Sequence, residues 1–160
     1  MIYSTIYDSS LGELLLLSDG TALTGLYFSG YWPDCETIPE KLPVFDHVIA
    51  WLDAYFRGED PKVTFALAPK GTPFQKNVWE ILLTIPKGQT RSYGDIAREM
   101  ALRTGKEKMS SQAVGQAVGR NPISIIIPCH RVVGARGQLT GYASGLDRKL
   151  WLLNHEEVIL

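Results

Sequence analysis

The chain has 160 residues, of which 45% are hydrophobic and 21% are charged, so it can form one globular domain or two small ones with a real core. Its two cysteines exclude a disulfide framework, and no other Cys or His spacing indicates a metal site. The first residues lack the pattern of a signal peptide and no apolar run is long enough to span a membrane, so we expect a cytoplasmic protein with no metal or other cofactor.

The formal net charge is −1, but the two halves of the chain differ in sign. Residues 1–70 carry four Lys and Arg against ten Asp and Glu, a net −6, whereas residues 71–160 carry twelve against seven, a net +5. This asymmetry favours a polyanion as the partner of the second half, although scattered surface charge would produce it too.

The first half predicts strands and one helix. The segments ELLLLS (13–18) and LTGLYFS (23–29) flank an Asp-Gly turn and are typical of a hairpin. Apolar residues then recur at helical spacing from Pro43 until Gly58, and KVTFAL (62–67) alternates like another strand. We expect residues 1–70 to form a structural, strand-rich α/β domain.

The second half predicts four helices. Thr72 is a good cap for the first, Ser92 for the second, and Ser110 and Ser111 open the third, QAVGQAVG. An apolar run, IIIP, and a glycine-rich hairpin, GARGQLTGY, follow them, a pattern typical of a winged helix-turn-helix domain over residues 71–160. The last helix begins near Leu146, and its spacing predicts three inward-facing leucines: Leu146, Leu150 and Leu153.

The third helix has an outer face without bulky side chains, formed by Gln112, Gly115, Gln116 and Gly119. Each glycine costs up to about 1 kcal/mol in a helix, so two of them need a reason. The face could press into a nucleic-acid groove, or the glycines could allow tight packing against another helix. Both interpretations fit the pattern.

Cys129 and His130 stand side by side in PCHRV, after the apolar run. A buried cysteine is usually inert packing. A reactive one needs a neighbouring base or cation, because few thiols are ionised at neutral pH. His130 could serve as that base through a bridging water, with Glu156 or Glu157 behind the imidazole.

Several segments together resemble the O6-alkylguanine-DNA alkyltransferases. The matching segments run in that family's order through nearly all of residues 71–157: GTPFQKNVW, IPKGQTRSYGDIA, QAVGQAVGRNPISIIIPCHRVVG, TGYASGLDRK and LLNHE. The combination is far more specific than any lone Cys-His pair.

The resemblance implies a catalytic group. Cys129 would accept the alkyl group, and His130, acting through water with Glu156 behind it, would generate the thiolate. Tyr93 would protonate the departing guanine, and Asn121 would brace the active-site turn. Substrate contacts are implied for four further residues: Val132, Tyr142, Ala143 and Ser144.

The resemblance also implies that the third helix enters the minor groove of double-stranded DNA carrying alkylated bases. The implied DNA contacts are Ser111, Gln112, Ala113, Gly115, Gln116, Arg120 and Arg131. Two positions depart from the family: Gln112 stands where many members have an arginine, and Ala143 where a serine is common.

We therefore expect an α/β protein with a small N-terminal sheet-plus-helix domain and a C-terminal winged helix-turn-helix alkyltransferase domain. As a monomer, it would flip out O6-alkylguanine, with O4-alkylthymine as a second candidate, and transfer the alkyl group irreversibly to Cys129. Three rivals remain: a non-catalytic damage-binding protein, a winged-helix regulator and a thiol hydrolase. The first two do not explain the Cys-His pair, and the third lacks an oxyanion site.

Overall fold

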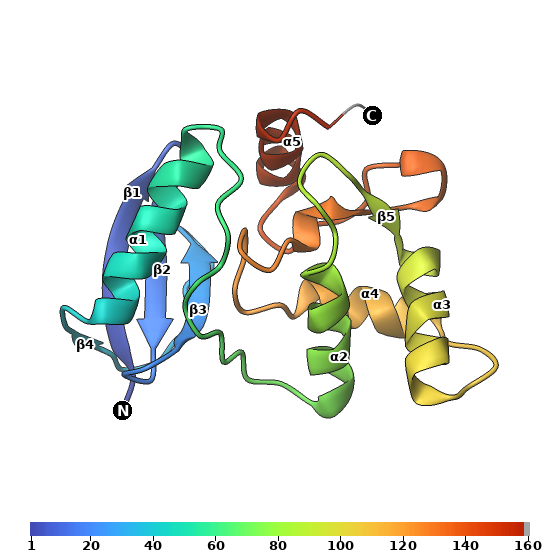
Figure 1. The fold of residues 1–160 in the computed structure, drawn as a ribbon, viewed down its shortest axis with the longest axis horizontal. Coiled ribbons are helices and arrows are strands. Elements are labelled where there is room, and N and C mark those ends of the chain that lie inside the picture. Colours follow the sequence, from blue (N-terminus) through green and yellow to red (C-terminus); the bar gives the residue numbers. More distant parts are fainter. Residues whose placement is uncertain (159–160) are drawn as a thin grey trace. The chain divides into compact units, whose positions relative to one another are not determined.

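The structure is a computed structural model that describes residues 1–158. It forms two compact units (Figure 1). The N-terminal unit comprises residues 1–70 with the short segment 122–124, and the C-terminal unit comprises residues 71–121 and the chain from Ile125 onward. The mixed α/β architecture predicted from the sequence is confirmed. No helix within residues 1–158 is both long and apolar enough to cross a membrane.

The N-terminal unit is built on a four-stranded sheet with the strand order β3-β2-β1-β4. Its strands are β1 (Tyr3–Ser9), β2 (Gly12–Ser18), β3 (Leu23–Phe28) and β4 (Ile38–Pro39). The first three pair antiparallel, and β4 pairs parallel to β1. The segment 122–124 adds to β3, because the Leu26 amide donates to the Pro122 carbonyl at 2.9 Å.

Helix α1 (Pro43–Phe56) packs on one face of this sheet (Figure 1). The apolar residues expected to face inward are buried: Val44, Val48, Trp51, Leu52 and Tyr55. Pro43 opens the helix, and the chain leaves it at Gly58, which has a φ of +93°. The predicted helix is confirmed.

The strand predicted at 62–67 is wrong. This segment makes a single bridge to the sheet, where the Leu23 amide donates to Ala66 at 2.9 Å and the Ala68 amide donates to Leu23 at 2.8 Å. Its alternating apolar residues do not cover a buried face, since Val63 is 39% exposed. Alternation without burial does not stabilise a strand.

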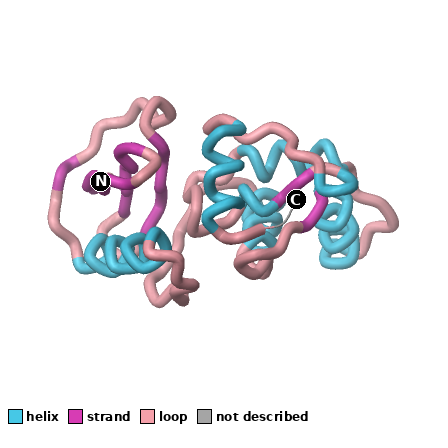
Figure 2. The backbone as a smooth tube through the Cα atoms, turned by 90° about the horizontal axis from the view of Figure 1, so that it is seen from above, coloured by secondary structure: helices cyan, strands magenta, loops and turns pink. Residues whose placement is uncertain are grey.

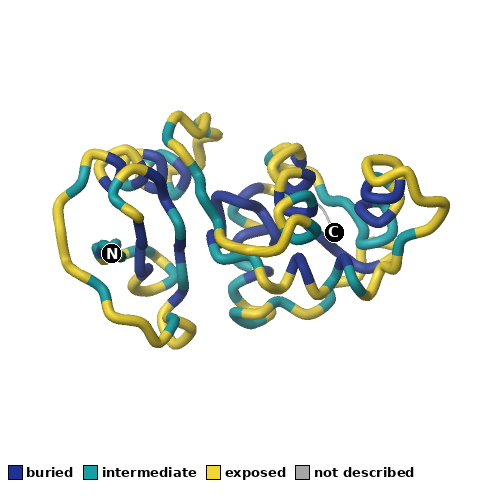
Figure 3. The backbone as a smooth tube through the Cα atoms, turned by 90° about the horizontal axis from the view of Figure 1, so that it is seen from below, coloured by how far each residue is buried: buried dark blue, intermediate teal, exposed yellow. Residues whose placement is uncertain are grey.

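The C-terminal unit contains four helices, as predicted: α2 (Pro73–Leu82), α3 (Tyr93–Thr104), α4 (Ser111–Gly119) and α5 (Leu146–His155). The side chains of Thr72, Ser92 and Ser110 cap the first three of these, and Thr72 and Ser92 form complete capping boxes with Gln75 and Asp95. Buried and exposed residues alternate along these helices (Figure 3).

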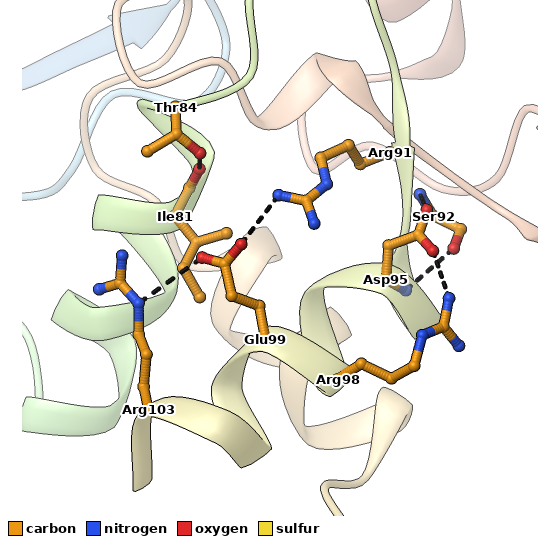
Figure 4. Close-up of polar contacts among 8 residues, drawn as sticks. All are labelled: Ile81, Thr84, Arg91, Ser92, Asp95, Arg98, Glu99 and Arg103. Carbon is orange, nitrogen blue, oxygen red and sulfur yellow. Dashed lines mark hydrogen bonds and ion pairs between the residues drawn. The ribbon is translucent and has the colours of Figure 1, made fainter.

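Ion pairs lie along α3, one in its first turn and two at Glu99 in its middle (Figure 4). Glu99 accepts from Arg91 at 3.1 Å and pairs with Arg103 at 3.6 Å. At the start of the helix, Asp95 pairs with Arg98. All these side chains are at least 30% exposed, so each pair adds little stability by itself.

Between α4 and α5 the backbone is mostly irregular (Figure 2). The apolar run before Cys129 forms a buried turn, in which Ile125 has a φ of +70°. The glycine-rich hairpin is also wrong: residues 134–142 form loops around the 3₁₀ turn η2 (Ala135–Gly137) and contain no strand.

Two short strands nevertheless organise this region. β5 (Arg91–Ser92) pairs parallel with β6 (Val132–Val133). Because β5 leads into α3 and β6 follows Cys129, this pairing brings the start of α3 close to the cysteine. Helices α2 and α4 are joined by the Trp79 indole, which donates to the Ala117 carbonyl at 2.8 Å.

The predicted inner face of α5 is partly wrong. Leu153 is buried as expected, but Leu146 is 48% and Leu150 39% exposed. The buried face is instead formed by Leu152, Leu153 and Lys149, whose side chain has no exposed surface. The lysine takes a core position because its ammonium finds carbonyl partners there.

Candidate active site

Cys129 opens the 3₁₀ turn η1 (Cys129–Arg131), directly before β6. It is 6% exposed, and its Sγ donates to the Tyr142 hydroxyl at 3.7 Å. Burial raises the pKa of the Cys129 thiol, although hydrogen bonds with Asn121 and Tyr142 and the charge of Lys149 oppose that rise. The resting thiol is therefore protonated, and it needs a base before it can act as a nucleophile.

His130 and Glu156 form a fully buried pair. His130 Nε2 and Glu156 Oε2 lie 2.6 Å apart, and both side chains have no exposed surface. Burial lowers the pKa of His130, which favours the neutral imidazole. Burial alone would raise the pKa of Glu156, but hydrogen bonds and charges from His130 and Arg131 lower it to about 2. Glu156 is thus ionised at neutral pH, and burial favours the neutral form of the imidazole beside it.

The second ring nitrogen of His130 makes no hydrogen bond with the carboxylate that holds the first. Nδ1 is buried and has no hydrogen-bond partner among residues 1–158. Since Nε2 is bound to the carboxylate, Nδ1 is the ring nitrogen that remains to accept a proton. A carboxylate behind an imidazole fixes its tautomer and stabilises the imidazolium that forms.

Arg131 is largely buried inside this unit. Its Nε donates to Glu156 Oε1 at 2.7 Å, and its Nη1 donates to the Ile85 carbonyl at 2.6 Å. Only 12% of the side chain is exposed. Glu156 and Ile85 thus hold the side chain, and the DNA contact expected of Arg131 stays a prediction.

Asn121 lies across the turn that leads to the cysteine. Its Nδ2 donates to the Ile127 carbonyl at 2.8 Å. Within that turn, Ile125 adopts the left-handed conformation, which is strained for a β-branched residue. The Asn121 hydrogen bond therefore stabilises a conformation that the local sequence disfavours.

Tyr93 is the first residue of α3, and its hydroxyl accepts from Thr140 Oγ1 at 3.5 Å. A Cβ added to Gly115 would lie 3.7 Å from the Tyr93 ring, whereas one added to Gly119 would meet nothing within 4 Å. A distance of 3.7 Å is an ordinary van der Waals contact, so packing against Tyr93 does not require a glycine at position 115, and Gly119 faces open space on α4.

Lys149 is the residue that the sequence analysis missed. Its Nζ donates to the Val132 carbonyl at 2.6 Å and to the Thr140 carbonyl at 3.2 Å. Burial lowers the pKa of Lys149 to about 8, and the negative charge of a Cys129 thiolate would oppose this. The available signal was its spacing, because Lys149 lies three residues before Leu152 and four before Leu153, on the same face of the helix. A lysine is almost never fully buried unless it is paired.

The loop expected to contact the substrate lies beside Cys129. Tyr142 is its point of contact with the thiol, and the Tyr142 carbonyl accepts from the Gly145 amide at 2.9 Å. The Ser144 carbonyl accepts from Arg148 at 3.2 Å, and Ala143 is exposed. Val132 presents its backbone to Lys149 while its side chain is buried.

The residues expected to contact DNA lie on or at the end of α4, apart from Arg131. Four of them are exposed: Ser111, Gln112, Gln116 and Arg120. Ala113 and Gly115 are half-buried at the edge of the same face. The structure thus separates an exposed, largely uncharged helix face from a buried, charged thiol site within one unit. Residues 1–158 contain no group of three His, Cys, Asp or Glu side chains able to hold a metal ion.

Comparison with known proteins covers both units. Residues 2–69 match the ribonuclease-like domain and residues 73–158 the DNA binding domain of 6-O-methylguanine DNA methyltransferase. The chain is 46% identical to the methylated-DNA–protein-cysteine methyltransferase of Mycobacterium leprae, covering 98% of this chain and 93% of that protein. It is also 46% identical to the Methanosarcina acetivorans protein of the same name, covering 97% and 98%.

A solved structure agrees with these matches. The crystal structure of Mycobacterium tuberculosis OGT in complex with DNA superposes with a TM-score of 0.86 at 42% identity, covering 97% of this chain and 92% of that one. Family matches over both units, near full-length identity above 40% and the same fold lead to one conclusion: the chain belongs to the 6-O-methylguanine-DNA methyltransferase family.

Proposed function

We propose that the protein repairs DNA by transferring the alkyl group of O6-alkylguanine to its own Cys129, once per molecule. The observation that carries this proposal is the buried His130–Glu156 pair adjoining the only buried cysteine of residues 1–158, in a chain of this family. O4-alkylthymine is a second candidate substrate, because its alkyl group also sits on an exocyclic oxygen.

The chemistry is a displacement by sulfur. As the bond from Sγ to the alkyl carbon forms and the bond from that carbon to O6 breaks, His130 takes the thiol proton and Glu156 stabilises the imidazolium. The departing guanine carries the bonding electrons and needs a proton, which Tyr93 supplies and then regains from His130 through solvent. The product is a thioether, and nothing in the site could hydrolyse it.

The base must leave the duplex to reach a cysteine that is only 6% exposed. Extrusion costs a few kcal/mol, which contacts with the flipped nucleotide and the surrounding DNA must offset. The exposed face of α4, from Ser111 to Arg120, is the surface we assign to the DNA minor groove. The protein would act as a monomer, since one chain contains every group in the scheme.

Intact-protein mass spectrometry after incubation with O6-methylguanine duplex DNA tests the proposal. We expect one added methylene per molecule, located on Cys129 by peptide mapping, with unmodified duplex as the control. Turnover beyond one equivalent, or DNA binding without any mass change, would contradict it. The latter outcome would favour a non-catalytic damage-binding protein.

A further inference from the structure

Arg131 joins three separate segments of the C-terminal unit. It lies in η1, donates from Nε to Glu156 at the end of α5, and donates from Nη1 to the Ile85 carbonyl in the segment after α2, at 2.7 and 2.6 Å. Arginine suits this task because its rigid guanidinium offers several donors in one plane. A contact to the DNA backbone would instead call for an exposed side chain, such as that of Arg120.

With Arg131 in place, both oxygens of the Glu156 carboxylate have a partner. Glu156 Oε2 faces His130 and Oε1 faces Arg131, so the carboxylate cannot rotate without breaking a charge-assisted hydrogen bond. The carboxylate in turn holds the imidazole, and the imidazole orientation decides where Nδ1 points. Arg131 therefore orients the base of the reaction without touching Cys129 or the substrate.

Arg131 also changes the charge around His130. Burial lowers the pKa of His130, Glu156 raises it, and the positive charges of Arg131 and Lys149 lower it again. The other groups facing the thiol are the Asn121 amide and the Tyr142 hydroxyl, neither of which is a cation or an acid at neutral pH. Without Arg131 the whole charge of Glu156 would act on the imidazole and favour its protonated form, which cannot accept a proton.

We propose that Arg131 is a positioning residue for thiol activation, which aligns Glu156 against His130 and shares its charge so that the imidazole stays available as a base. This inference rests on the proposed function for its biological meaning. Its structural content, the control of His130 by Arg131, is independent of DNA repair.

Two variants separate orientation from charge. Arg131→Gln removes the cation, and Arg131→Lys keeps a cation that cannot reach both Glu156 and Ile85. Both are made in a Cys35→Ser background, so that Cys129 is the only thiol. Each protein is assayed against pH in two ways: single-turnover transfer from O6-methylguanine duplex DNA, and alkylation by iodoacetamide, which requires no DNA.

We expect Arg131→Gln to move the acid limb of both pH profiles to higher pH and to slow both reactions at neutral pH by about tenfold to a hundredfold, part of what a general base contributes. Arg131→Lys should slow both reactions at every pH without moving the acid limb. NMR titration of the His130 ring should show a raised pKa in Arg131→Gln and an unchanged pKa in Arg131→Lys. A purely structural arginine would lower the melting temperature and leave both profiles in place, which would overturn the inference.

If Arg131→Gln does not fold, Arg131→Lys still decides the matter, because wild-type rates in that variant would contradict the positioning role.

The DNA-free assay separates the two proposals. Iodoacetamide profiles that move as expected, with no transfer from methylated DNA by the parent protein, would leave the role of Arg131 standing and remove the proposed function.

Discussion

The two units of the chain bury different kinds of residue. In the N-terminal unit the fully buried side chains are apolar, such as Leu16 and Phe28, or are small hydroxyls such as Ser18. The C-terminal unit buries an apolar core as well, but within residues 71–158 it also buries His130, Lys149 and Glu156. Buried ionisable groups are costly unless they are paired, so their concentration around one thiol indicates chemistry rather than stability.

The two cysteines give the largest expected effect and the most direct test of this comparison. Cys35 is exposed in the N-terminal unit and Cys129 is buried in the charged cluster. We expect Cys129→Ser to abolish methyl transfer while leaving duplex binding nearly unchanged, and Cys35→Ser to transfer at the wild-type rate. Intact mass and gel-shift measurements check both. Methyl groups found on Cys35 would reverse the roles assigned to the two units.

Buried polar groups in the two units should differ in their contribution to stability. Glu156→Ala leaves His130 and Arg131 without their carboxylate, and breaking a buried pair in this way costs about 3–5 kcal/mol in the free energy of unfolding. Ser18→Ala in the sheet removes two hydrogen bonds, one donated to the Ala22 carbonyl at 2.6 Å and one accepted from the Gly20 amide at 3.0 Å, and should cost about 1–2 kcal/mol. Urea unfolding measures both values. Equal losses in the free energy of unfolding would show that the buried charged groups contribute no more to stability than a buried hydroxyl of the sheet.

The dependence of stability on pH should also come from the C-terminal unit. The unfolded chain protonates His130 below its ordinary pKa of 6.5, whereas burial keeps the folded imidazole neutral to lower pH. Stability should therefore fall as the pH drops from 7 to 5, because protonation of His130 then favours the unfolded chain. Glu156, whose pKa is about 2 in the folded protein against an ordinary 4.5, would add its own loss only below that range.

Matched variants isolate the histidine. His130→Gln should flatten the pH dependence of stability between pH 7 and 5, and His47→Gln, on the exposed side of α1, should leave it as in the parent. Urea unfolding at pH 7, 6 and 5 supplies the comparison. A slope that survives His130→Gln would place the responsible group elsewhere.

Local sequence predicted the helices better than it predicted the site. Thr72, Ser92 and Ser110 cap helices by bonds to residues three positions away, so the pattern is visible in the chain. The strand predicted at 62–67 failed because burial depends on distant neighbours. The partners of Arg131 could not be predicted for the same reason, since Glu156 and Ile85 lie 25 and 46 residues from it in the sequence.

The resemblance to a family supplied what local patterns could not. It named Cys129, His130 and Glu156 together, and the structure places the latter two 2.6 Å apart. It gave no reason to single out Lys149, whose partners are two backbone carbonyls. Backbone carbonyls carry no sequence signal, so such a contact becomes visible only in the folded chain.

The smallest expected effect concerns Gln112, on the exposed face of α4. Its neutral amide stands where the resemblance implies an arginine, which could stack, donate a fork of hydrogen bonds and attract phosphates, each on the order of 1 kcal/mol. Gln112→Arg should therefore speed transfer from duplex DNA, where the flipped state must be stabilised. It should hardly change transfer from the free modified base, because nothing has to be flipped.

Gln112→Ala should slow the duplex reaction by about tenfold or less, the loss expected for one neutral hydrogen bond. Thr64→Arg, an exposed position in the N-terminal unit, adds the same charge away from α4 and should leave the duplex rate unchanged. Single-turnover rates on duplex and free base distinguish the possibilities. If Gln112→Ala is as slow on the free base as on the duplex, Gln112 shapes the fold or the pocket, and α4 does not support the flipped base through this residue.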